Sequence, residues 1–508
     1  LLPEQFGGVE DRKLKVGEMA YKVVIVPGLE TIRKTTLEAL GKFKASGGTV
    51  IVMGDLPKYE DAVESDVPKK ILGGSKKIQF LRDELIAALE PFRTVGIRNA
   101  GGDIAGNYIY NYRHDNDCEW LFICRGRNPS LAGNRSGYNN AENLKITLEG
   151  EFTPIIWDTI SGGTYPADYE VRDGKTIIRR SMYQHDSLLL KLLPYDASIK
   201  SETKPALRTE REIFVRKPVA YRLDEPNALL IDQAEWRVDS GSLTSDKEWH
   251  GIEEMLRLNN MAAKEAGLPA YNGAQPWVEP PEVLSHTVDL RVYFESEIDY
   301  NGAFLAIENA ELCEVILNGV TAEKGTHGYF VDESIKKIAL PDIKRGENEL
   351  LIRTPIGIRT KVEWCYLLGD FGVKVAGCEK TITTLPEKLG FSTVTDQGLP
   401  FYTGNIEYDE EIETPDCELV VRATEYRGEL IRVFLDGMDK GVIAYEPYRL
   451  NLGKVSAGKH TITYRLYGNR FNAFGALHNT CKGDGWVGPN IWRTTGDRWC
   501  YEYQIRPM

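Results

Sequence analysis

Two segments of this chain follow the same order of strands and turns. In the first, an apolar strand ends in Asn318-Gly319, and in the second a similar strand ends in Asp436-Gly437. Asn-Gly and Asp-Gly favour the tight primed turn of a β-hairpin, because both residues tolerate a positive φ. Each copy then passes through a second turn into a final strand. The copies are about 115 residues apart, the length of one sandwich domain, so the pattern predicts two β-sandwiches in tandem.

Length and charge limit the possible partners. The chain has 508 residues, enough for roughly three to five domains of ~100–200 residues each. Its net charge of −13 argues against nucleic acid, which is bound through clustered Lys and Arg. The sequence contains no run of about eighteen apolar residues, so it predicts no membrane span. The eight cysteines form no Cys-x-x-Cys pair and are interpreted as reduced core thiols.

Residues 1–105 have the pattern of an α/β domain. Residues 21–27 and 49–53 are nearly continuous apolar runs, as in strands that are covered on both faces of a parallel sheet. The helix expected between them has an apolar stripe formed by Leu37, Leu40 and Phe43. A compact βαβ unit with a parallel sheet, of the flavodoxin type, is therefore expected at the N-terminus.

The rest of the chain is expected to be mainly β. Residues 106–225 contain short strands separated by Asn-, Gly- and Asp-rich turns, which indicate a β-sandwich. Residues 226–284 are interpreted as a connector that contains a helix near 252–266. The two repeats, 285–395 and 396–508, are expected to be jelly-roll sandwiches.

These segments resemble parts of large bacterial glycoside hydrolases. Residues 21–57 resemble the glutamine-amidotransferase-like module of glycoside hydrolase family 106, the α-L-rhamnosidases, and of family 42. The repeats are similar to the galactose-binding-like, sugar-binding jelly roll of family 2. Residues 397–405, 469–479 and 488–492 resemble C-terminal segments of such enzymes. The resemblance implies an accessory region that binds an oligosaccharide or polysaccharide and accompanies a catalytic barrel domain on the parent protein.

The chain departs from these enzymes in two respects. About 100 residues precede the first sandwich, whereas a catalytic (β/α)8 barrel needs about 250. Amidotransferase chemistry needs a cysteine and a histidine, and none occurs before Cys118 and His114. Because the sequence opens at Leu1 without Met or a signal peptide, we expect a piece of a longer protein, either in the bacterial cytoplasm or secreted.

An alternative is a self-sufficient glycoside hydrolase that uses carboxylates of the sandwiches. Hydrolysis needs two carboxyl groups, ~5–5.5 Å apart for retention and ~6.5–9.5 Å for inversion. The candidates lie beside aromatic residues: Glu363 with Asp370, Asp484 with Asp497, and Glu502. They are equally consistent with strand-edge or turn positions. A surface adhesion module is a third interpretation.

Glycan contact is expected in loops of the second repeat. The expected residues are Asn469, Arg470, Asn472 and His478 on one side and Trp486, Trp492 and Arg493 on the other. The two indoles could instead pack against a neighbouring domain. Residues 499–505 alternate aromatic with polar side chains and are interpreted as a final strand facing the core.

No cofactor is expected except a structural Ca²⁺. Asp115-Asn116-Asp117 places oxygen ligands close together, as calcium prefers, although such a cluster is also an ordinary turn.

Overall fold

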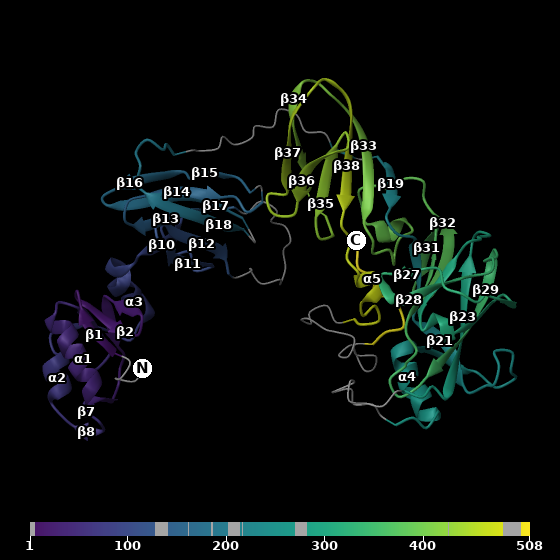
Figure 1. Ribbon diagram of the computed structural model, residues 1–508, viewed down its shortest axis with the longest axis horizontal. Helices are drawn as coiled ribbons and strands as arrows, with labels where there is room; N and C mark the ends of the chain where they lie inside the picture. The colour runs from purple at the N-terminus through teal and green to yellow at the C-terminus, as the bar shows by residue number, and fades with distance from the viewer. Residues whose placement is uncertain are drawn as a thin grey trace. The chain divides into compact units, whose positions relative to one another are not determined.

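The computed structural model describes residues 6–126, 141–160, 162–183, 186–201, 214–215, 217–269, 282–424, 426–480 and 499–507. These residues are mainly β, with a small parallel sheet near the N-terminus, which confirms the fold class expected from the sequence (Figure 1). The chain divides into two units, residues 1–207 and 208–508. Among the described residues, no helix combines the length and the apolar composition that crossing a membrane requires.

Unit 1 begins with the α/β region. Its parallel sheet has the order β4 (Val23–Val26), β6 (Thr49–Met53) and β9 (Lys76–Ile78). The predicted helix, α1 (Lys34–Ala45), buries its apolar stripe and ends before Gly47, whose φ of 90° suits a helix stop. The other elements are β1 (Phe6–Glu10), β2 (Lys13–Val16), β3 (Met19–Tyr21), β5 (Thr31–Ile32), β7 (Tyr59–Glu60), β8 (Val63–Glu64), α2 (Val67–Leu72), α3 (Arg82–Leu89) and the 3₁₀ turn η2 (Glu90–Phe92).

The sandwich of unit 1 follows at once. One sheet has the order β11 (Tyr108–His114), β12 (Glu119–Arg125), β18 (Ser187–Pro194), β14 (Phe152–Trp157) and β15 (Thr164–Pro166). The other has the order β10 (Val95–Asn99), β13 (Glu142–Glu149), β17 (Lys175–Met182) and β16 (Tyr169–Arg172). Alternate residues of both sheets fill a shared core, and the sandwich agrees with the short strands and turns seen in the sequence. The sandwich begins at β10, about ten residues before the expected boundary.

Unit 2 contains a large and a small sandwich. The first sheet of the large sandwich has the order β20 (Asn227–Ile231), β30 (Cys365–Gly369), β24 (Phe304–Glu308), β28 (Asp332–Ala339) and β27 (Tyr329–Phe330). Its second sheet contains β22 (His250–Glu254), β21 (Gln233–Val238), β23 (His286–Ser296), β29 (Gly346–Ile356), β25 (Glu314–Leu317) and β26 (Val320–Thr321), with β31 (Phe371–Ala376) and β32 (Glu379–Thr384) attached through β23. Two 3₁₀ turns, η4 (Ala310–Leu312) and η5 (Val394–Gln397), complete this part.

The small sandwich pairs a five-stranded with a two-stranded sheet. The larger sheet has the order β19 (Ala220–Leu223), β33 (Ile406–Thr414), β38 (Gly458–Leu466), β35 (Ile431–Leu435) and β36 (Met438–Ile443). The smaller pairs β34 (Cys417–Arg422) with β37 (Arg449–Val455). Its first strand, β19, precedes the whole large sandwich in the chain, so the large sandwich interrupts the small one.

The segment expected to be a connector belongs to the large sandwich. Residues 226–284 contain β20, β21, β22 and helix α4 (Met255–Glu265), and all five residues of β20 are buried. Helix α4 was expected; the strands were not. The run of β20 is apolar and covered on both faces, like the runs 21–27 and 49–53 that were interpreted as strands, but it was assigned to the connector.

The repeated turns occupy equivalent places in the two sandwiches. Asn318 and Asp436 both adopt a left-handed conformation, with φ of 51° and 50°, and each joins a β-hairpin. Asn318 exchanges two hydrogen bonds with the backbone of Glu349, and Asp436 exchanges the same two with Thr461. These bonds tie each hairpin to the long strand beside it, β29 or β38. The predicted correspondence of the two turns is confirmed.

Candidate functional site

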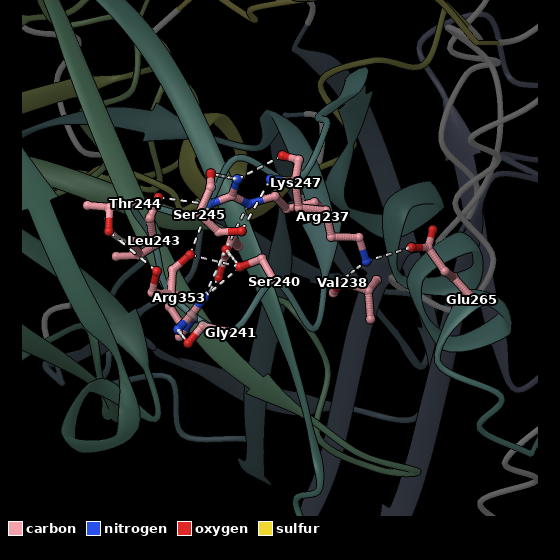
Figure 2. Close-up of polar contacts among 12 residues, drawn as sticks. Arg237, Val238, Ser240, Gly241, Leu243, Thr244, Ser245, Lys247, Glu265 and Arg353 are labelled. Carbon is pink, nitrogen blue, oxygen red and sulfur yellow. Dashed lines mark hydrogen bonds and ion pairs between the residues drawn. The ribbon is translucent and has the colours of Figure 1, made fainter.

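A buried charge cluster organises one loop of the large sandwich (Figure 2). Arg237 is fully buried, and its Nε donates to Asp289 at 2.9 Å. Its other four N–H groups donate to backbone carbonyls of Ser242, Leu243, Ser245 and Lys247. All five guanidinium donors are therefore used, and the loop after β21 is fastened to the sheet.

Both oxygens of the carboxylate in this cluster also accept hydrogen bonds from within the protein. Asp289 also accepts bonds from Arg353, at 2.7 Å and 3.1 Å, and from the hydroxyl of Ser240. A group with all its donors and acceptors used has nothing to offer a ligand. We interpret the cluster as architecture rather than as a binding site.

A second buried cluster holds the C-terminal residues against the large sandwich. Asp232 accepts from His478 Nε2 at 3.1 Å and from the hydroxyl of Tyr503. That hydroxyl also accepts from Lys380 Nζ at 2.9 Å. Each of these four residues is at least nine-tenths buried.

Opposing effects set the pKa values in this cluster. Burial alone would raise the pKa of Asp232, but the bond from His478, the charge of Lys380 and the bond from Tyr503 together hold it below its ordinary value. Burial lowers the pKa of Lys380 and raises that of Tyr503. Asp232 therefore remains an anion that compensates a buried lysine.

The expected glycan-contact segment leaves the small sandwich and packs on the large one. Asn472 is fully buried, and its amide exchanges two bonds with the backbone of Arg506, at 2.8 Å and 3.0 Å. Asn469 accepts from the backbone N–H of Phe471 at the start of the short helix α5 (Phe471–Phe474), and Arg470 pairs with Glu225. The structure thus gives these residues, and His478, contacts within the chain. Their contact with a glycan stays a prediction.

Three of the expected contact residues and two acids lie outside the described residues: Trp486, Trp492, Arg493, Asp484 and Asp497. Residues 499–507 do not form the expected strand; Trp499 makes only an isolated bridge with Asn479. Glu502, a catalytic candidate, is exposed in this segment. The backbone here bonds to residues around 477 and 377 instead of to a neighbouring strand, which is why its alternation does not correspond to a sheet.

The proposed pair of Glu363 and Asp370 is not brought together. The two acids flank β30 at opposite ends, about 20 Å apart at the rise of a strand. That separation exceeds the span of any hydrolytic carboxyl pair. The structure offers a different partner, because β30 runs antiparallel to β24 with Ala306 opposite Tyr366. Continuing this register puts Glu308, the last residue of β24, opposite Trp364, the residue after Glu363, and the charge of Glu308 acts on Glu363.

Glu308 and Glu363 form a pair of neighbouring carboxylates in the large sandwich. Glu363 is exposed to solvent, yet partial desolvation and the charge of Glu308 raise its pKa to about 7. Among the described residues neither carboxylate has a hydrogen-bond partner. Sequence reasoning missed Glu308 because only the pairing of β24 with β30, more than fifty residues away, reveals it.

An aromatic cluster lies beside the pair. Tyr366, Phe330 and Phe474 pack with ring centroids 5.1 to 6.1 Å apart. The Tyr366 hydroxyl donates to the carbonyl of Ala473 at 3.0 Å, which fixes α5 over the sheet. Burial raises the pKa of Tyr366, and the charges of Glu363 and Glu308 add to this, so the pair borders the cluster. One exposed and one half-buried acid thus lie beside a packed aromatic cluster.

The structure also gathers the expected calcium ligands. Ligand atoms of Asp115, Asp117 and Cys118 lie within 4.8 Å of one another. A thiol is a poor calcium ligand, and Cys118 is buried, so two exposed carboxylates remain. A structural Ca²⁺ here stays a prediction.

Comparison with known proteins gives no family assignment. No family model matches the chain, and no curated protein matches it. Among solved structures, the chain is similar to a rhamnosidase from Novosphingobium sp. PP1Y, with 16% identity and a TM-score of 0.30 over 69% of this chain and 31% of that one. It also resembles Gan42B, a family 42 β-galactosidase from G. stearothermophilus, with 10% identity and a TM-score of 0.23 over 34% of this chain and 32% of that one.

A family 2 glycoside hydrolase from Bacteroides cellulosilyticus DSM 14838 is similar at 11% identity, with a TM-score of 0.18 over 48% of this chain and 32% of that one. The chain thus spans about a third of the length of these solved proteins. Similarities at such TM-scores do not establish a common fold.

Proposed function

We propose that this chain is a carbohydrate-active protein, the glycan-binding accessory region of a glycoside hydrolase, and that the Glu308–Glu363 pair contacts the sugar. The observation that carries the proposal is Glu363. It combines an exposed carboxyl group, a pKa raised to about 7 and the absence of a hydrogen-bond partner among the described residues. The order of domains in the sequence, which resembles that of family 106 enzymes, supports the same class of ligand.

The chemistry of a sugar matches such a group. A carboxyl group that is half protonated near neutral pH both donates and accepts hydrogen bonds, as hydroxyl groups do. The partly exposed indole of Trp364 follows Glu363 directly and is held by a 3.1 Å bond from its Nε1 to Glu254. Apolar rings with a few oriented polar groups are the usual lining of a small-molecule site.

The test is calorimetric titration of the 508-residue chain with a panel of neutral oligosaccharides that includes rhamnose- and galactose-containing ones. Glu363→Gln is expected to weaken binding about tenfold, the effect of losing one good hydrogen bond to a charged group. Asp370→Asn is the matched control, because Asp370 is also exposed and flanks the same strand at its other end. Equal affinities in the two variants, or no binding by the unmodified chain, would overturn the proposal.

The alternative function is hydrolysis by the same pair. It is favoured by the pKa of Glu363, since a general acid must be protonated near neutral pH while its partner is ionised. Aryl glycoside hydrolysis by the purified chain, abolished in both Glu308→Gln and Glu363→Gln, would support it. Binding without turnover would leave the accessory role.

A further inference from the structure

The outer face of the four-stranded sheet in unit 1 carries a row of three cations. Arg98 on β10 lies opposite Lys145 on β13, and Lys145 lies opposite Arg179 on β17. Their neighbours along these strands, such as Leu144 and Ile178, face the core. Like charges directly opposite one another destabilise a sheet unless they are compensated.

The two outer cations of the row are neutralised and the middle one is not. Arg98 pairs with Glu90 at 2.7 Å, and Arg179 pairs with Glu170 at 2.8 Å. Among the described residues, Lys145 has no ion-pair or hydrogen-bond partner. One positive charge is thus left uncompensated at the centre of the row.

Lys145 lines a shallow recess of about 350 Å³ that is rich in donors. Ser181 Oγ donates to Asn143 Oδ1 at 2.6 Å, and both residues line the recess. This bond leaves the two amide protons of Asn143 available. Arg180 also lines the recess, but it lies opposite Leu144, on the core side of the sheet. One acid, Asp168, is present at the rim.

We propose that this recess binds an oxyanion on a charged glycan, a uronate carboxylate or a sulfate ester. An oxyanion would accept from Lys145 and Asn143 together and would compensate the charge of Lys145. The choice of a glycan rests on the function proposed above, whereas the preference for an oxyanion rests on the recess alone. Because the chain has a net charge of −13, a local cluster and not the overall field must attract the ligand.

The test compares three trisaccharides by calorimetry at low and moderate salt: trigalacturonate, a sulfated galactotriose and uncharged galactotriose. Lys145→Gln is expected to weaken binding of the two charged ligands about tenfold and to reduce its salt dependence. Lys175→Gln is the matched control, since Lys175 lies on β17, the strand next to that of Lys145, but is paired with Glu149 at 3.2 Å. It should change affinity by less than about twofold.

The outcomes separate the two proposals. If Lys145→Gln weakens binding of the charged trisaccharides and Glu363→Gln does not, the recess proposal is supported. This holds even if no neutral sugar binds the carboxylate pair. The recess proposal would be overturned if Lys145→Gln and Lys175→Gln weakened binding equally. It would also be overturned if charged and uncharged galactotriose bound equally, or if neither charged sugar bound. Tighter binding of a short single-stranded DNA than of either charged sugar would also overturn the assignment to glycans.

Discussion

The large sandwich holds two charged clusters that differ in how fully their bonding groups are used. Around Arg237 and Asp289, every guanidinium donor and both carboxylate oxygens have partners inside the protein (Figure 2). Around Glu308 and Glu363, neither carboxylate has a hydrogen-bond partner among the described residues. The first cluster is buried and the second includes an exposed acid.

The difference distinguishes charged groups that stabilise the fold from charged groups that are free to bind a ligand. A buried charge is tolerated only when it is paired and hydrogen-bonded, so the Arg237 cluster must be complete for the domain to fold. An exposed acid near a second acid is under no such requirement, and its raised pKa persists because nothing in the fold compensates it. Substitutions should therefore affect stability strongly in the first cluster and weakly in the second.

The largest expected effect comes from Arg237→Ala. It leaves Asp289 with only Arg353 and Ser240 as partners and frees four buried carbonyls of the loop. Removing one partner of a buried ion pair costs about 3–5 kcal/mol. The midpoint of urea unfolding, followed by tryptophan fluorescence, should fall accordingly.

A double variant sharpens this test. Arg237→Met with Asp289→Leu removes both charges, which by itself is often neutral. The loop carbonyls remain without donors, so the double variant should recover only part of the lost stability. Complete recovery would show that the loop contacts contribute nothing.

An intermediate effect is expected for Asn472→Ala. Asn472 is fully buried and makes two bonds to the backbone of Arg506, so its loss should cost about 1–3 kcal/mol and release the C-terminal residues to limited proteolysis. Asn469→Ala is the control. It removes a single hydrogen bond to the backbone N–H of Phe471 and should cost no more than about 1 kcal/mol. Similar proteolysis of both variants would contradict the role given to Asn472.

The sequence predicted what depends on neighbours along the chain. The helix stripe of α1 and the turns at Asn318 and Asp436 follow from period and turn chemistry, and each is confirmed. The buried strand β20 was assigned to a connector, although its apolar run is of the same kind as those at 21–27 and 49–53. The proximity of Glu308 to Glu363 was missed because the register between two distant antiparallel strands cannot be read from either segment alone.

The smallest effect on stability is expected for Glu363→Gln, and it should depend on pH. The pKa of Glu363 is raised from 4.5 to about 7 in the folded chain, so the folded state holds the proton more tightly than the unfolded state. The favourable contribution is complete below pH 4.5 and is lost as the pH rises to about 7. Because Glu363 is exposed, solvent screening limits the loss to about 1 kcal/mol.

Glu363→Gln lacks this titration. Its unfolding free energy should match that of the unmodified chain at pH 4 and exceed it by about 1 kcal/mol at pH 8. In Glu308→Gln the burial that raises the pKa remains while the like charge is gone, so the midpoint should lie between 4.5 and 7. Chemical denaturation at several pH values measures both. A difference that does not change with pH would mean that Glu363 titrates as an ordinary surface acid, and the contrast between the two clusters would then reduce to burial alone.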